Sequence, residues 1–263
     1  MTGGWRQRMS FTIAVAGKGG SGKTTVAALI IRALVKGGAG PVLGVDADPN
    51  SNLAEAFGIE VTKTIGGVLA EFIDKKLGIP PGMTKESYLE LQLSGSVEES
   101  KNVDFLVMGR KQGPGCYCYP NVLLRGFIDK LSGNYPYMVI DNEAGMEHLS
   151  RKNIESIDLF ALVADHSVKG LRAARRISGI ADDLGISVKR RLLIVNRFRA
   201  ENGALLEPSV RETGIEHVIY IEDDQAILRA DVEGMSFMDL PDESAMVRSI
   251  SGLLKETGIS FAE

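Results

Sequence analysis

Residues 17–25 of the sequence read GKGGSGKTT. This stretch matches the pattern G-x-x-x-x-G-K-[ST]. Glycines let successive backbone N–H groups converge on phosphate oxygens, and the start of the following helix adds positive potential. We therefore predict a phosphate-binding loop in which Lys23 reaches the β- and γ-phosphates and the Thr24 hydroxyl holds Mg²⁺. The predicted nucleotide-binding residues of the loop are Gly17, Lys18, Gly19, Gly20, Ser21, Gly22, Lys23, Thr24 and Thr25.

The same glycines also satisfy G-x-G-x-x-G, the signature of a dinucleotide-binding fold. That turn has no need of a lysine at the start of its helix, so Lys23 and Thr24 favour the phosphate loop. The context agrees with this choice. The loop follows the apolar run FTIAVAG (11–17), which is typical of a strand buried on both faces, and it opens a predicted helix from Thr24 to about Lys36.

Strand-like and helical segments alternate along the rest of the chain. Apolar runs predict strands at 41–48, 103–109, 137–145, 158–165, 191–198 and 217–221. Helices are predicted at 51–57, 65–76, 121–133, 168–184, 204–213, 223–232 and 243–257. The alternation predicts an α/β fold of the P-loop NTPase type, a mostly parallel twisted sheet with helices on both faces. No linker or repeat interrupts it, which favours one domain over 1–263, with 1–9 as a leader before a second start at Met9. Apart from the helix at 65–76, the pattern of 59–102 is too weak to assign structure or contacts with a client.

Three acids close predicted strands. Asp46 and Asp48 end the second strand, and Asp141 ends YMVID (137–141). The carboxyl ends of parallel strands form the ligand-binding edge of such a sheet, so these acids should lie near the loop. Asp141 is placed to bind Mg²⁺, directly or through water. The alternative for each acid taken singly is a helix cap or a solvated loop.

The only two cysteines, Cys116 and Cys118, lie in GPGCYCYPN (113–121). Thiolates select Zn²⁺, Ni²⁺, Cu(I) or iron–sulfur clusters, and zinc and cluster sites usually take four protein ligands. One chain supplies two, and its three histidines (148, 166 and 217) lie elsewhere in the sequence. Two such loops that met on a two-fold axis would bring four sulfurs together. We therefore predict a metal site at a homodimer interface; the alternatives are a pair of inert small hydrophobes or a transient disulfide.

Composition narrows the function classes. The chain has 263 residues, 44% hydrophobic residues, a net charge of −4 and a pI near 5.6. The acidic balance argues against non-specific nucleic-acid binding. No apolar run approaches the roughly 18–20 residues of a membrane helix, and the C-terminal segment lacks a basic amphipathic face. We expect a cytoplasmic protein with neither a nucleic-acid nor a membrane partner.

Several segments, in order along the chain, resemble the ATPases of the MinD type, also called SIMIBI. KGGSGKT (18–24) resembles their deviant Walker A motif. DADPNSNL (46–53) resembles switch I and DNEAGMEH (141–148) switch II. NRF (196–198) resembles the adenine-contact segment, and YIEDDQAILRAD (220–231) the loop after the last core strand.

This resemblance implies an ATPase, which hydrolyses ATP to ADP and phosphate as a homodimer. It implies that Lys18 reaches across to the partner's nucleotide. It further implies that Asp48 orients the hydrolytic water, that Asp46 lies near Mg²⁺ and that Asn196 hydrogen-bonds the adenine. The alternative for Asn196 is support of a turn, a common role for an Asn that follows a strand. The expected catalytic residues are thus Lys18, Lys23 and Asp48, and the expected Mg²⁺ residues are Thr24, Asp46 and Asp141.

Within that superfamily, the C-x-C loop together with DNEAGMEHLSR (141–151) resembles the CooC-type accessory ATPases of carbon monoxide dehydrogenase maturation. The family implies ATP-driven dimerisation linked to nickel delivery into the dehydrogenase's metal cluster, and it includes factors that serve acetyl-CoA synthase. The resulting expectation is a metallochaperone that binds Ni²⁺ or Zn²⁺ at an interfacial site, with one of these enzymes as client.

Two other functions stay open at this point. An ATPase similar to the nitrogenase iron protein would carry a bridging [4Fe–4S] cluster, although that family draws its two ligands from separate segments of each chain. A positioning ATPase similar to MinD or ParA would bind a membrane or DNA, and the C-x-C loop would then have no role.

Overall fold

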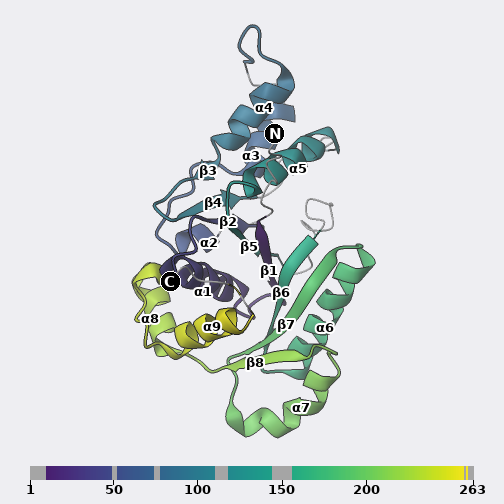
Figure 1. Cartoon of the computed structure of the whole chain (residues 1–263), viewed down its shortest axis with the longest axis vertical. Coiled ribbons are helices and arrows are strands. Elements are labelled where there is room, and N and C mark those ends of the chain that lie inside the picture. Colours follow the sequence, from purple (N-terminus) through teal and green to yellow (C-terminus); the bar gives the residue numbers. More distant parts are fainter. Residues whose placement is uncertain are drawn as a thin grey trace, which may run out of the picture.

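The computed structural model describes residues 10–48, 52–73, 78–109, 118–143, 156–257 and 259, with the backbone alone for 118–121 (Figure 1). Its centre is an eight-stranded sheet in the order β3-β4-β2-β5-β1-β6-β7-β8. The strands are β1 (Phe11–Gly17), β2 (Val42–Asp46), β3 (Val97–Glu98), β4 (Val103–Val107), β5 (Tyr137–Asp141), β6 (Ser156–Asp165), β7 (Ser187–Asn196) and β8 (His217–Ile221). Every neighbouring pair is parallel except β3 with β4. The predicted α/β fold with a mostly parallel sheet is confirmed.

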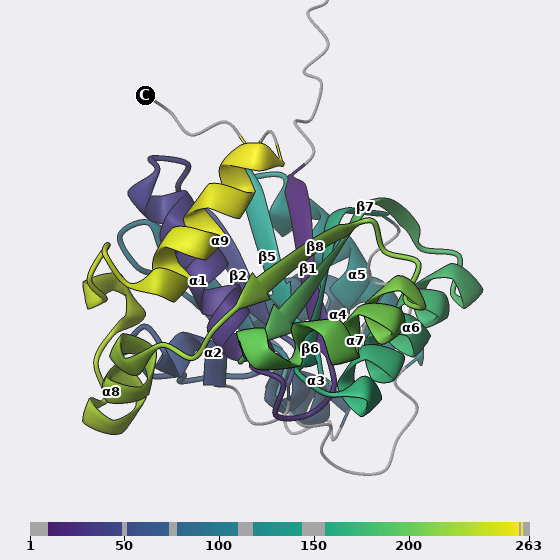
Figure 2. The same ribbon diagram turned by 90° about the horizontal axis from the view of Figure 1, so that it is seen from below.

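Helices cover both faces of the sheet (Figure 2). One face carries α1 (Lys23–Lys36), α2 (Asn52–Glu55), α8 (Gln225–Glu233) and α9 (Ala245–Glu256), with the short 3₁₀ helix η3 (Phe237–Asp239). On the other face, α6 (Val168–Asp183) and α7 (Gly203–Arg211) pack over β6 and β7, and the 3₁₀ helix η2 (Ala200–Asn202) precedes α7. Beside them, α3 (Ile65–Ile73), α4 (Lys85–Ser94) and α5 (Cys118–Ser132) pack over β2, β4 and β5.

Strand β1 shows why the apolar runs form central strands. Ile13 and Val15 point into the core under α1, whereas Ala14 and Ala16 point into the core under α6, and all four are fully buried. A strand with both faces covered needs apolar side chains at every position. The last residue of β1, Gly17, leads directly into the loop at 17–25, so the sheet fixes where that loop begins.

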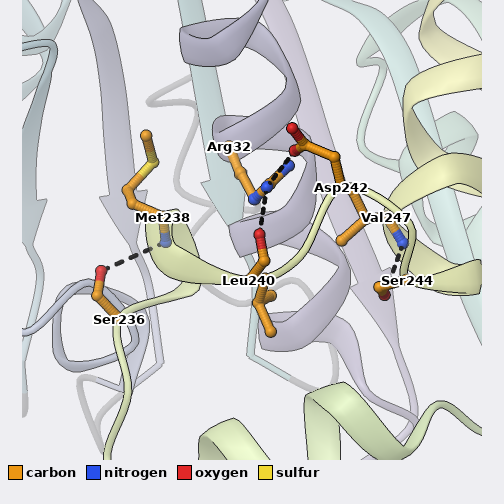
Figure 3. Close-up of polar contacts among 7 residues, drawn as sticks. All are labelled: Arg32, Ser236, Met238, Leu240, Asp242, Ser244 and Val247. Atoms are coloured by element: carbon orange, nitrogen blue, oxygen red, sulfur yellow. Dashed lines mark hydrogen bonds and ion pairs between the residues drawn. The ribbon is translucent and has the colours of Figure 1, made fainter.

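A buried arginine of α1 binds the segment between α8 and α9 (Figure 3). The side chain of Arg32 is 3% exposed, and its Nη2 donates to the carbonyl oxygen of Leu240 at 2.6 Å and to Oδ1 of Asp242 at 2.5 Å. In the same segment, the Ser236 hydroxyl accepts a hydrogen bond from the N–H of Met238, and the Ser244 hydroxyl accepts one from the N–H of Val247. The helix that follows the loop is thus braced by the segment between α8 and α9.

The structure differs from the prediction at several places. The predicted strand 41–48 ends at Asp46, and the strand predicted at 137–145 ends at Asp141. Strand β7 begins at Ser187, four positions before the predicted 191. Helix α4 and the two-residue strand β3 were not predicted, and both fall in the segment 59–102. Of the helices in the described ranges, none has the length and hydropathy that a membrane span requires.

Candidate functional site

The loop between β1 and α1 has the backbone shape that its glycines predict. Gly20 and Gly22 have positive φ angles of 76° and 92°, a region that side chains rarely occupy. A Cβ on Gly17 would lie 2.1 Å from the carbonyl oxygen of Val163 in β6, and one on Gly22 would lie 2.3 Å from Nδ2 of Asn196. Close neighbours therefore require glycine at Gly17 and Gly22, and backbone conformation favours it at Gly20 and Gly22.

The loop leaves the start of α1 open to a ligand. Gly22 is the N-cap residue, and within the described residues no side chain caps the helix and no acid lies in its first turn. The hydroxyl of Ser21 is buried and has no hydrogen-bond partner in that same part of the chain. Free N–H groups and an unpaired hydroxyl at a helix start form a site for an anion such as a phosphate.

The two loop lysines have different surroundings. Lys23 is 8% exposed, and its ammonium group lies 3.4 Å from the carbonyl oxygen of Lys18, at the centre of the loop. Lys18 itself is exposed to solvent. This is the arrangement expected if Lys23 serves the nucleotide of its own chain and Lys18 is available to another molecule.

The predicted magnesium residues Thr24 and Asp141 touch each other. The Thr24 hydroxyl donates a 2.6 Å hydrogen bond to Oδ2 of Asp141, and Oδ1 of Asp141 is buried without a partner among the described residues. Asp141 also lies directly opposite Asp46 in the register of β5 and β2. A hydroxyl and an unsatisfied carboxylate oxygen are hard ligands of the kind that Mg²⁺ prefers, so the donor set fits that ion.

Burial of the two acids changes their protonation. Burial raises the pKa of Asp141 to about 7, assisted by the nearby charge of Asp46 and opposed by the hydrogen bond from Thr24. Burial also raises the pKa of Asp46 to about 6, against two hydrogen bonds from backbone N–H groups. Two buried carboxylates side by side favour a cation that neutralises them.

The structure gives Asp46 a second role that its position in the sequence did not reveal. Its Oδ1 accepts from the N–H of Asp48 at 3.0 Å, and its Oδ2 accepts from the N–H of Leu53 at 2.8 Å. Asp46 therefore joins the end of β2 to Asp48 and to the start of α2, and all three residues belong to the segment that resembles switch I. Asp48 lies two residues beyond the strand and is partly buried.

The end of β7 and the residue after it contact the phosphate loop. Asn196 is 5% exposed, and its Nδ2 donates to the carbonyl oxygen of Ser21 at 2.9 Å. Arg197, which has a positive φ of 55°, reaches the carbonyl oxygen of Gly20 at 3.5 Å. The predicted contact of Asn196 with adenine stays a prediction, since the structure shows this residue as a brace of the loop.

Two contributors were missed by sequence reasoning. Arg197 was not singled out, because its contact with Gly20 joins positions 177 residues apart. Asn142 follows Asp141 and is 1% exposed; its Nδ2 donates to the carbonyl oxygen of Val15 at 3.0 Å. Its position after the acidic strand end, within the segment that resembles switch II, indicates a place in the site without indicating a role.

A cavity of about 580 Å³ adjoins the loop on the side of α1. It borders Thr24 and Thr25, and its other walls come from α2, α8 and the segment that leads into η3. Asn52, Glu55 and Asp231 supply its polar groups. The volume lies within the range of small-molecule sites, and its position provides room for a ligand that continues beyond the phosphate loop.

The cysteine loop lies largely outside the described residues. Cys116 is not described, and neither is His148 of the segment similar to switch II. Cys118 is the first residue of α5, which follows β4 and therefore starts at the sheet edge that carries the phosphate loop. Among the described residues, no group of three or more His, Cys, Asp or Glu side chains is arranged to hold a metal ion. The described part of one chain thus supplies no complete soft-metal site.

Comparison with known proteins gives the family. The model of the CobQ/CobB/MinD/ParA nucleotide binding domain matches residues 12–237. The chain belongs to this family. An uncharacterized ATP-binding protein of Methanocaldococcus jannaschii is 38% identical over 93% of this chain and 97% of its own length. The carbon monoxide dehydrogenase accessory protein CooC of Rhodospirillum rubrum is 32% identical over 87% of this chain and 89% of its own length.

Solved structures of the CobQ/CobB/MinD/ParA family support the same fold. The septum site-determining protein MinD from Pyrococcus horikoshii, complexed with Mg-ADP, superposes with a TM-score of 0.69 at 24% identity, covering 94% of this chain and 96% of that one. At this identity the likeness shows the fold alone. Together with the family match and the geometry of the loop, it makes this chain an ATP-binding ATPase of the MinD/ParA fold.

Proposed function

We propose that this protein is an ATP-driven maturation factor that dimerises and carries a metal ion for a metalloenzyme, carbon monoxide dehydrogenase or acetyl-CoA synthase. The observation that carries the proposal is the position of the C-x-C pair. It ends on the first residue of α5, at the sheet edge that holds the phosphate loop. The likeness of the chain to CooC over most of its length supports this function.

The nucleotide site supplies the driving reaction. Lys23 and the open start of α1 would bind the phosphates, and Thr24 and Asp141 would hold Mg²⁺. When bound, that ion neutralises charge on the β- and γ-phosphates. Asp48 is proposed to orient the attacking water. Lys18 is exposed and is proposed to contact the phosphates of the partner, which links dimerisation to ATP.

The metal site requires the second copy. Two thiols are half of the four ligands that a structural zinc or cluster site takes. Cys118 begins a 15-residue helix, and thiolates are the form of cysteine that binds metals. We propose that Cys116 and Cys118 of both copies hold one Ni²⁺ or Zn²⁺ as cargo.

ATP hydrolysis would then change the metal affinity. Loss of the γ-phosphate removes contacts that hold the switch segments, and the two subunits separate or shift. Asp46 joins the nucleotide site to α2 through its bonds to Asp48 and Leu53, so it is a physical connection through which switch I responds. A site shared by two chains loses affinity when those chains part.

Metal titration of a cysteine variant tests the proposal. We expect wild-type protein with ATP to bind one Zn²⁺ or Ni²⁺ for every two chains. We expect the Cys116→Ala/Cys118→Ala variant to bind neither ion, while its affinity for ATP is unchanged. Unchanged metal binding by that variant would exclude the C-x-C site. A brown protein with bleachable visible absorbance after anaerobic purification would indicate an iron–sulfur cluster instead.

A further inference from the structure

One face of α6 carries four cations that the fold does not use. Lys169, Arg172, Arg175 and Arg176 are all exposed, and their spacing of three, six and seven residues places them along about 10 Å of one helix surface. The opposite side of α6 buries Leu171, Ala174, Ile177 and Ala181 in the core over β6 and β7. That apolar stripe fixes the helix, so the cations are free for another purpose.

The four cations line a hollow of about 780 Å³ together with Lys18 of the phosphate loop. Glu212, just after α7, is the acid in its wall. Within the described residues, none of the five basic side chains forms an ion pair or donates a hydrogen bond. The nearest acid further along α6, Asp182, already pairs with Arg191. The hollow therefore has a net positive charge in a chain whose total charge is −4.

We propose that this hollow is the docking surface for an acidic segment of a partner protein. The inference rests on the proposed function, in which a client must come close to the metal and nucleotide sites. The first turn of α6 follows the carboxyl end of β6, the strand next to β1 in the sheet. A segment docked on the four α6 cations lies on the same edge of the sheet as the phosphate loop.

The chemistry of the surface selects carboxylates. Arginine presents a planar fork of N–H donors that matches a carboxylate in a two-point contact, and three of the four α6 cations are arginines. Unpaired cations on an acidic protein also guide an acidic partner to this one face. Each exposed pair contributes little, so affinity arises from several pairs acting together.

A nucleic acid fits the same surface less well. Its affinity depends on neutralising many phosphates along an extended track, whereas these cations cover two turns of one helix and a single loop residue. The carboxylate of Glu212 would repel a phosphate backbone, and a nucleic acid offers no cationic group that could pair with it. A protein segment carries basic as well as acidic side chains and can satisfy Glu212.

Charge reversal on α6 tests the proposal against a matched control. The test variant is Arg172→Glu/Arg176→Glu. The control is Arg248→Glu/Lys255→Glu, which makes the same charge change at exposed positions of α9, on the opposite face of the sheet. The probes are a short fluorescent glutamate-rich peptide and a DNA duplex of equal charge, with binding followed by fluorescence anisotropy at low and at physiological salt. Thermal unfolding and ATPase activity of each variant report its integrity.

We expect the peptide to bind wild-type and control protein, and to bind the α6 variant about tenfold more weakly or worse. An equal loss in both variants, or no peptide binding by wild-type protein, would overturn the proposal. Tighter binding of the duplex than of the peptide, lost in the α6 variant, would make the face a nucleic-acid site and would also overturn it. If the α6 variant unfolds, Arg172→Gln/Arg176→Gln replaces it. None of these outcomes depends on the cysteines, so failure here is separable from failure of the metal-site proposal.

Discussion

The Thr24 hydroxyl donates a 2.6 Å hydrogen bond to the carboxylate of Asp141, 117 positions further along the chain. Thr24 lies in the first turn of the helix that follows the phosphate loop, and Asp141 is the last residue of β5. The bond therefore joins the two segments that resemble the Walker A motif and switch II. It also leaves one carboxylate oxygen buried without a partner among the described residues, which is the feature that favours a cation at this point.

Asp141→Asn should separate stability from activity. The amide can still accept from Thr24 but removes a buried charge beside Asp46, so we expect the protein without Mg²⁺ to melt a few degrees higher at pH 8. Hydrolysis needs the charged group, so we expect the ATPase rate to fall at least about a hundredfold. Thermal melts and a phosphate-release assay measure the two effects. A variant with lower stability and an unchanged rate would show that Asp141 is a structural residue.

The two raised pKa values predict a pH dependence. The pKa values of Asp46 and Asp141 rise from 3.8 to about 6 and about 7, so the folded state holds protons there that the unfolded state has already lost. Their contribution to stability is fully present below about pH 4 and is lost as pH rises through 6 to 7.

Melting temperatures without Mg²⁺ should therefore fall between pH 5 and 8, and the fall should be smaller in Asp141→Asn. Binding of the cation requires the charged carboxylates, so the Mg²⁺-dependent affinity for ATP should increase over the same interval. Isothermal titration at several pH values measures this second effect. A melting temperature that rises with pH equally in both proteins would contradict the assignment.

Gly17→Ala and Gly19→Ala should differ sharply. A Cβ on Gly17 meets the backbone oxygen of Val163 at 2.1 Å, whereas one on Gly19 has nothing within 4 Å. We expect Gly17→Ala to cost more than about 2 kcal/mol in the free energy of unfolding, because β1 and β6 must shift apart, and Gly19→Ala to cost less than about 1 kcal/mol. Urea unfolding of both variants measures the difference, and equal losses would show that the loop does not pack as described.

Arg32→Ala should remove the contact between α1 and the segment between α8 and α9. The change removes the group that donates to the carbonyl oxygen of Leu240, and it leaves a cavity where the buried Arg32 side chain was. We expect a loss of about 2–4 kcal/mol in the free energy of unfolding. The exposed Arg248 on α9 is the control, and its replacement by alanine should change stability by less than about 0.5 kcal/mol. Similar values for both would argue that this contact contributes nothing.

Local patterns predicted the core of the fold well. Gly17, Lys23 and Thr24 carry a motif whose spacing follows from the way a phosphate is bound, and the continuous apolar runs identified the central strands. Helix α4 lies in a polar stretch with too weak a pattern to assign: Leu89, Leu91 and Leu93 recur at every second position and not at the helical spacing, and the structure exposes 55% of Leu91 and buries the other two. Strand β3 has two residues and leaves no periodic pattern.

One part of the site could not be predicted because it depends on contact between distant segments: the bond from Arg197 to Gly20 joins positions 177 residues apart and arises only when the strands are placed side by side. The bonds that Asp46 accepts from the N–H groups of Asp48 and Leu53 span only two and seven positions. No local pattern distinguishes a strand-end acid that binds an ion from one that accepts hydrogen bonds from nearby backbone N–H groups. In this protein, Asp46 clearly does the second, and its predicted contact with Mg²⁺ stays a prediction.

Native mass spectrometry of the wild-type protein, with Zn²⁺ or Ni²⁺ present and with ATP or ADP added, measures whether two copies share one metal ion. We expect a dimer in ATP that carries one metal ion for its two chains, and a larger share of metal-free monomer in ADP. A protein that stays monomeric in ATP, or that binds one metal ion in each separate chain, would contradict this expectation.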